Sequence, residues 1–265
     1  DALRHPYLDE ALLIAATAGR TLGMEPRSWP KYNRELRSNR RFYDFLFDSG
    51  PVHLDKVVRW SHFANRVTGD DLPAPKVALP ADRLPAAASE IGAGFVIIQP
   101  FSAMADKQPS ADVFRRMIEV IPSDLAVLIT GAPSDLDGNP DFKDLLDRPN
   151  VRFDDCRLEP LSAKLRAARL VISVDTAVMH LAVVAGAPTI CLASAAYVGE
   201  IVPYAGEIMP DNVTFFFYDM PCRGCLGNCS QPHENGRFAC VERLEIEPVL
   251  DKISSMVSNR SREIL

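Results

Sequence analysis

The chain has 265 residues, of which 29 are Lys or Arg and 35 are Asp or Glu, so its formal net charge at pH 7 is −6. Apolar residues make up 47% of it and charged residues 24%, which excludes a disordered, collagen-like or coiled-coil chain. The acidic balance disfavours nucleic-acid binding through a broad basic face.

Residues 1–72 show helix and strand patterns that indicate an amino-terminal domain. Apolar spacing predicts a helix over 8–22, and the run 43–50 predicts a strand closed by a polar turn. A second helix should follow and carry Leu54, Val57, Val58 and Phe63. Prolines and glycines then cluster, which predicts a linker over 73–90.

Residues 91–265 show a clearer pattern, in which apolar runs alternate with amphipathic segments. Strands are predicted at 94–100, 125–131, 151–153, 170–175 and 189–193, and helices at 110–120, 162–168 and 177–185. Buried strands separated by helices indicate a parallel sheet covered on both faces, a Rossmann-like α/β domain. The most apolar stretch, 181–198, is interrupted by Gly186 and Pro188, which suits a buried strand better than a membrane span.

Three loops of this domain follow strands and open helices, at 100–109, 131–135 and 175–180. The carboxyl ends of parallel strands form the usual ligand crevice, and helix amino termini attract phosphate. Simpler roles compete: Asp175 and Thr176 could only cap a helix, His180 could be a core residue, and Lys107 could be a solvated charge. Neither a Gly-x-Gly-x-x-Gly nor a Walker motif supports dinucleotide or P-loop binding.

Several motifs resemble the lipopolysaccharide heptosyltransferase family, glycosyltransferase family 9. The most specific is Ser-Val-Asp-Thr-Ala-Val-Met-His-Leu-Ala at 173–182, followed by Gly-Ala-Pro at 186–188. Lys107-Gln108-Pro109 is similar to the family's Lys-x-Trp-Pro loop, and Gly131-Ala132-Pro133 to its glycine-rich turn. The stretches His5 to Glu10 and Tyr43 to Gly50 are similar to its amino-terminal motifs.

The resemblance implies two Rossmann-like domains facing a cleft, the GT-B type, with a nucleotide-activated sugar on the carboxy-terminal domain and the acceptor on the amino-terminal one. The sugar donor is usually ADP-heptose, and the acceptor here would be a glycan or a protein. Transfer would invert the anomeric carbon and need no catalytic metal. The family's catalytic base, an Asp in a glycine-rich loop, would precede residue 1, so the amino-terminal domain is expected to be incomplete.

The donor-binding residues that the resemblance implies are Ser102, Lys107, Asp135, Asp175, Thr176, Ala177 and His180. The chain departs from the family at Ala177, where a glycine is usual, and at the absent tryptophan of the Lys-x-Trp-Pro loop. The loop expected to read Gly-x-Thr-x-Pro is here Ala-Ser-Ala-Ala-Tyr, at 193–197.

Two other functions stay open: a nucleotide-sugar-binding or assembly protein without catalysis, and an interaction module. An Asp or Glu in a glycine-rich loop ahead of His5 would favour the enzyme. The expected location is the cytoplasm, either in solution or peripheral to the inner membrane.

Four cysteines mark a loop-rich insertion over 220–241: Cys222, Cys225, Cys229 and Cys240. Four closely spaced sulfurs suit a structural zinc or iron ion, with His233 as a substitute ligand. An iron-binding four-cysteine site in the related autotransporter heptosyltransferases supports this, and two disulfides or free thiols are the alternative. Cys156 and Cys191 are expected to be small buried hydrophobes.

Overall fold

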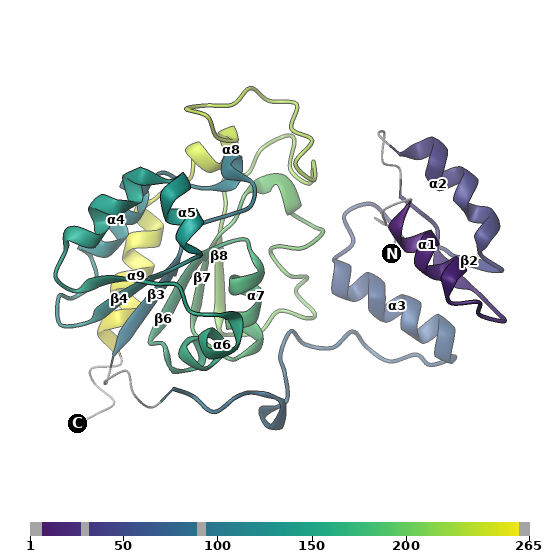
Figure 1. Ribbon diagram of the computed structural model, residues 1–265, viewed down its shortest axis with the longest axis horizontal. Helices are drawn as coiled ribbons and strands as arrows, with labels where there is room; N and C mark the ends of the chain where they lie inside the picture. The colour runs from purple at the N-terminus through teal and green to yellow at the C-terminus, as the bar shows by residue number, and fades with distance from the viewer. Residues whose placement is uncertain (1–6, 28–31, 89–93, 260–265) are drawn as a thin grey trace. The chain divides into compact units, whose positions relative to one another are not determined.

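The computed structural model describes residues 7–27, 32–88 and 94–259. The chain divides into two compact units, one of Asp1–Pro75 with Gly199–Ile208 and one of Lys76–Val198 with Met209–Leu265 (Figure 1). His5 and Pro6 of the first family motif, and residues 89–93 around the end of the expected linker, lie outside the described residues.

The first unit is a small α/β unit with a two-stranded parallel sheet. Its elements are α1 (Leu8–Ala15), β1 (Leu22–Met24), α2 (Asn33–Asn39), β2 (Phe45–Phe47) and α3 (Lys56–Thr68). Strands β1 and β2 pair in parallel, with Leu22 opposite Phe45 and Met24 opposite Phe47. The helix predicted over 8–22 is too long: Thr17 adopts a φ of 46°, which a helix cannot continue through, and a strand follows.

Residues Gly199–Ile208 join this unit although they come late in the chain. Asp55 caps α3 by accepting from the backbone N–H of Val57 at 2.7 Å, and its other oxygen accepts from Ala205 N–H at 3.1 Å. The buried Glu200 carboxylate pairs with Arg27 and accepts from His53 N–H at 2.8 Å. Assigning all of 91–265 to one domain was therefore wrong for this segment, because polar partners in the first unit hold it.

The second unit contains a six-stranded, wholly parallel sheet. Its strands are β3 (Phe95–Gln99), β4 (Ala126–Thr130), β5 (Val151–Asp154), β6 (Leu170–Val174), β7 (Thr189–Leu192) and β8 (Val213–Phe216). Its helices are α4 (Ala111–Glu119), α5 (Pro133–Gly138), α6 (Leu158–Ala167), α7 (Ala177–Val184), α8 (Ala239–Glu242) and α9 (Glu247–Asn259). The predicted parallel sheet is confirmed, whereas β8 and α9 were not predicted.

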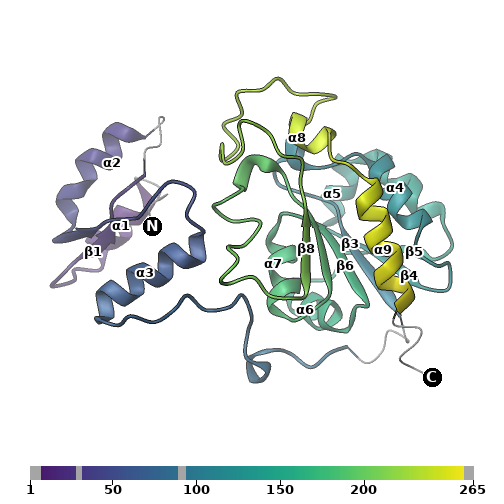
Figure 2. The same cartoon turned by 180° about the vertical axis from the view of Figure 1, so that it is seen from behind.

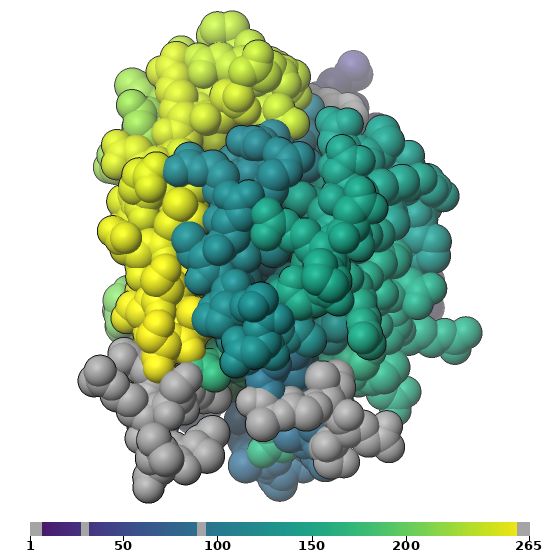
Figure 3. Space-filling view, turned by 90° about the vertical axis from the view of Figure 1, so that its left-hand side faces the viewer, coloured from purple at the N-terminus to yellow at the C-terminus, as the bar shows by residue number. Residues whose placement is uncertain are grey.

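Helices cover both faces of this sheet (Figures 1 and 2). Side chains of α4 and α9 pack with Val96 and Ile98 on one face, where the two helices lie side by side (Figure 3). Side chains of α6 and α7 pack with Phe95 and Ile97 on the other. Successive residues of a strand point to opposite faces of the sheet, and both faces are covered by helices. All five residues of β3 are therefore buried, as its unbroken apolar run predicted.

The expected linker packs on the second unit over part of its length. Leu79 N–H donates to the carbonyl of Val184, and Ala88 N–H donates to that of Ala163, both at 3.1 Å. Among the residues that the structure describes, no helix is both long and apolar enough to cross a bilayer.

The strand order β5-β4-β3-β6-β7-β8 indicates where a ligand would bind. The chain moves outward from β3 through β4 to β5, then returns to β6 on the other side of β3. In such sheets ligands bind beyond the carboxyl ends of the strands, where the order reverses. The relevant loops therefore follow β3 and β6.

Candidate functional site

A buried polar network links the carboxyl ends of β3 and β6. The side-chain carbonyl of Gln99 accepts from the hydroxyls of Thr176 at 3.0 Å and Ser173 at 3.3 Å. Its amide donates to the carbonyl of Phe101 at 2.8 Å. This network orients the Thr176 hydroxyl toward the sheet. Gln99 was not predicted as a site residue, although it is a polar residue that closes an apolar strand run.

Lys107 and Asp175 form a buried ion pair beside this network. The Lys107 ammonium lies 3.0 Å from Asp175 Oδ1 and donates to the Asp175 carbonyl at 3.1 Å. Lys107 is only 7% exposed, so its alternative role as a solvated charge is wrong. Burial raises the pKa of the Asp175 carboxyl, and the Lys107 ammonium opposes that rise.

The amino terminus of α7 has no side-chain cap. Thr176 is its N-cap residue but makes no side-chain capping hydrogen bond, so the alternative that Thr176 serves as a side-chain cap is not supported. The first N–H groups of a helix have no acceptor within the helix and carry partial positive charge. Ala177 is exposed at the first helical position. Positive charge and N–H donors therefore meet at this edge of the sheet.

The other predicted loops lie along the same edge and are tied together. Ser102 N–H donates to the side chain of Gln108 at 3.1 Å, and the Gln108 amide donates to Asn139 at 2.7 Å. Asn139 in turn donates to the carbonyl of Asp135 at 2.7 Å. The Asp135 carboxylate accepts from Ala132 N–H at 2.8 Å and so caps α5. One of its oxygens thus has a structural role that the sequence analysis did not assign.

His180 lies one turn into α7 and is half-buried. Burial lowers the pKa of its imidazole, and the Lys107 charge lowers it further. His180 is therefore a neutral hydrogen-bonding group at pH 7.

Replacing His180 with glutamine should flatten part of the pH dependence of folding stability. Below about pH 6.5 the unfolded chain protonates this histidine while the folded chain, with its lowered pKa, resists protonation. Wild-type stability should therefore fall as the pH falls through this window, and the variant should lose less. Urea unfolding at pH 7 and pH 5 checks this, and equal losses in both proteins would contradict it.

The cysteine-rich segment 220–241 packs against the loops of this site. Cys240 Sγ accepts from the backbone N–H of Ala195 at 3.4 Å, and Phe238 N–H donates to the carbonyl of Asp106 at 2.9 Å. His233 Nε2 lies 3.1 Å from the Asp106 carboxylate, and the imidazole ring stacks on Phe238. These contacts do not direct His233 toward the cysteines, so they do not favour it as a substitute metal ligand.

All six cysteines are free thiols, and Cys191 is fully buried as expected. Burial and the neighbouring sulfurs raise the pKa of Cys222, Cys225 and Cys240. Within the described ranges no three His, Cys, Asp or Glu side chains are grouped so that they could hold a metal ion. The four-cysteine metal site therefore stays a prediction.

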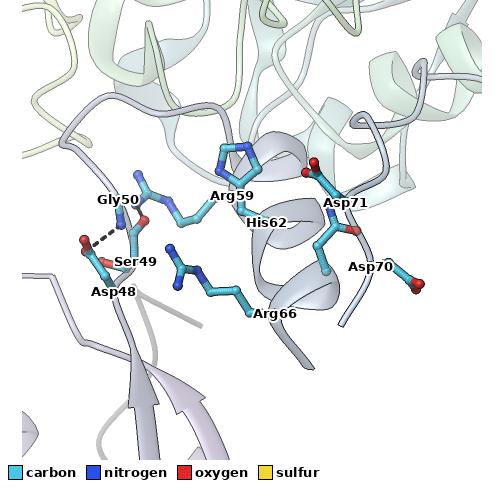
Figure 4. Close-up of a pocket in the computed structure, with 9 residues that line it drawn as sticks. Asp48, Ser49, Gly50, Arg59, His62, Arg66, Asp70 and Asp71 are labelled. Carbon is cyan, nitrogen blue, oxygen red and sulfur yellow. Dashed lines mark hydrogen bonds between the residues drawn. The ribbon is translucent and has the colours of Figure 1, made fainter. Parts of the chain in front are cut away.

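A polar pocket of about 410 Å³ lies in the first unit (Figure 4). It is lined by Asp48, Ser49, Gly50, Arg59, His62, Asn65, Arg66, Asp70 and Asp71. Arg59 is buried and donates to the carbonyls of Ser49, Pro51 and Leu54, which fixes the turn after β2. His62 and Arg66 extend from the exposed side of α3. Sequence analysis missed this pocket, although the spacing of these basic residues suits one helix face.

A family model described as glycosyltransferase family 9 (heptosyltransferase) matches residues 32–214, more than half of the chain. The chain belongs to glycosyltransferase family 9. This confirms the resemblance, and membership makes the chain a glycosyltransferase.

Solved structures of a heptosyltransferase and of a family 9 glycosyltransferase share its fold. The E. coli heptosyltransferase WaaC with ADP matches with a TM-score of 0.65 and 18% identity, over 97% of this chain and 71% of that one. WaaC with ADP-2-deoxy-2-fluoro heptose matches with a TM-score of 0.58 and 17% identity, over 100% and 71%. A family 9 glycosyltransferase from Veillonella parvula matches with a TM-score of 0.60 and 14% identity, over 94% and 70%. No curated protein sequence matches the chain.

Proposed function

We propose that the chain transfers a heptose-like sugar from a nucleoside diphosphate donor to an acceptor hydroxyl, with inversion at the anomeric carbon. The observation that carries this proposal is the buried Lys107–Asp175 pair beside the uncapped start of α7, at the point where the strand order reverses. ADP-heptose is the donor class that the family suggests, and the WaaC structures contain ADP or an ADP-heptose analogue.

The site would act on the leaving group. As the bond to the sugar breaks, the nucleoside diphosphate gains negative charge that must be stabilised. The Lys107 ammonium and the first N–H groups of α7 supply fixed positive charge, so we propose that this chemistry needs no metal ion. Ala177 is exposed at the helix start, and neutral His180 offers a hydrogen bond. We assign the catalytic base to no residue of this chain.

Nucleotide binding tests the proposal directly. Thermal unfolding of the whole chain should shift upward with ADP, because a ligand that binds only the folded state stabilises it by mass action. Comparison with UDP, GDP and AMP identifies the base and the need for a second phosphate. A chain that no nucleoside diphosphate stabilises, and that calorimetry shows not to bind one, would refute the donor assignment.

We further propose that the pocket beside α3 binds a polar part of the acceptor. Arg66 and His62 suit a carboxylate or phosphate, and the lining aspartates Asp48, Asp70 and Asp71 suit sugar hydroxyls. A glycan with acidic sugars fits this combination of charges better than an apolar acceptor.

Replacing Arg66 with alanine should weaken binding of glucuronate, used as a probe, about tenfold, because a charge-assisted hydrogen bond is lost. The exposed Arg34 on α2 provides a matched control, Arg34→Ala, in the same unit. Saturation-transfer NMR titrations measure both, and glucose reports the contribution of the carboxylate. Equal binding to wild type and Arg66→Ala would remove this pocket from the acceptor site.

Two further expectations follow from the cysteines. Six free thiols suit a reducing compartment, and we therefore propose a cytoplasmic location. Elemental analysis of the purified chain tests the four-cysteine site: about one zinc or iron per chain, lost in a Cys229→Ser variant, supports it, and its absence contradicts it.

A further inference from the structure

The loop after β7 carries an aromatic ring against the ammonium group of the candidate site. Lys107 Nζ lies 4.5 Å from the centroid of the Tyr197 ring, within the range of a cation–π interaction. The same ammonium is paired with Asp175 on another side. Tyr197 lies in the loop 193–197, where the sequence departs from the family pattern.

The loop that carries this ring is held from two directions. On one side, the hydroxyl of the buried Ser194 donates to the Asp175 carboxylate at 3.2 Å. On the other side, the cysteine-rich segment donates to its carbonyls at 2.8 Å, from Gly224 N–H to Ala195 and from Leu226 N–H to Ala196. The ring is thus placed by the ion pair and by residues 220–241 together.

The aromatic ring of Tyr197, and not its hydroxyl, makes the contact with the Lys107 ammonium. In the described part of the chain, the Tyr197 hydroxyl has one hydrogen-bond partner, the Met104 sulfur at 3.6 Å, which is a weak acceptor. The ring face, in contrast, meets the full positive charge of an ammonium group that is itself buried. Electrostatic interactions are stronger where water is kept away.

We propose that Tyr197 is a positioning residue, whose ring holds the Lys107 ammonium in place for the diphosphate of the donor. This inference rests on the proposed function, because it assumes that Lys107 meets phosphate. It also gives the cysteine-rich segment a role in the donor site, since that segment supports the loop that carries the ring.

Substitutions that separate the ring from the hydroxyl test the inference. Tyr197→Phe should bind ADP within about twofold of wild type, and Tyr197→Leu should bind it about fivefold to tenfold more weakly, as expected for loss of a partly desolvated cation–π contact. Adenosine, which lacks phosphate, should bind both variants as it binds wild type. Calorimetry measures these affinities, and thermal unfolding confirms that each variant is folded.

A double-mutant cycle with Lys107→Met separates positioning from a general structural effect. When the ammonium is absent, Tyr197→Leu should cause no further loss of ADP affinity, measured by competition for weak binding. An equal loss with and without Lys107, a Phe variant as weak as the Leu variant, or unchanged affinity in Tyr197→Leu would each overturn the inference. If wild type binds no nucleoside diphosphate, the proposed function itself fails.

Discussion

Replacing Lys107 with methionine should weaken ADP binding about 30-fold and slow sugar transfer about 100- to 1,000-fold. Under the proposed function, the variant loses a charge-assisted hydrogen bond to the donor phosphates and the charge that stabilises the leaving diphosphate. Methionine keeps a similar length and apolar character, so the neighbouring Tyr197 ring retains a contact. Calorimetry with ADP and a transfer assay measure the two effects.

The matched control for this prediction is Lys143→Met, which removes an exposed lysine of the same unit that pairs with Asp137. Its ADP affinity should equal that of wild type. The donor assignment would be contradicted if Lys107→Met bound ADP as tightly as this control does.

Replacing Asp175 with alanine should lower the free energy of unfolding by about 3–5 kcal/mol. The variant leaves the Lys107 ammonium buried without its counter-charge, and an unpaired buried charge is strongly destabilising. A double variant, Lys107→Met with Asp175→Leu, should be more stable than Asp175→Ala, because it removes both charges. Urea unfolding of the three proteins provides the comparison.

The two units allow this loss to be assigned. Trp60 lies on α3 in the first unit, where its ring contacts Phe63, so its fluorescence reports unfolding of that unit. Asp175→Ala should shift the transition seen by far-ultraviolet circular dichroism, which includes the second unit, more than the fluorescence transition. An unchanged circular dichroism transition would show that the pair contributes little to stability.

The central sheet could be predicted because most of its strands are contiguous apolar runs in the sequence. Each of β3, β4 and β6 is an apolar run bounded by turn residues, and burial on both faces requires that pattern. Strand β8 was missed although its Val-Thr-Phe-Phe run is rich in β-branched and aromatic residues, which favour strands. The early end of α1 depends on the backbone at Thr17, which side-chain spacing does not record.

The candidate site could be predicted only as a set of loops. Fold topology brings the loops after β3 and β6 together, so the neighbourhood of Lys107 and Asp175 followed from strand order. The hydrogen-bond and ion-pair partners of each side chain could not be predicted from strand order. Gln99 meets Thr176 across 77 positions, and Tyr197 meets Lys107 across a similar span, so no local pattern reveals either contact.

The segment Gly199–Ile208 makes the two units inseparable by a single cut in the polypeptide. An isolated fragment ending near residue 75 would contain α3 but lack Glu200, the buried counter-charge of Arg27 and neighbour of Arg59. Half-proteins made by simple truncation would therefore expose guanidinium groups that the intact chain neutralises. The backbone passes between the two units at three places, near residues 75, 198 and 208. A hinge motion would therefore have to bend three separate backbone segments together.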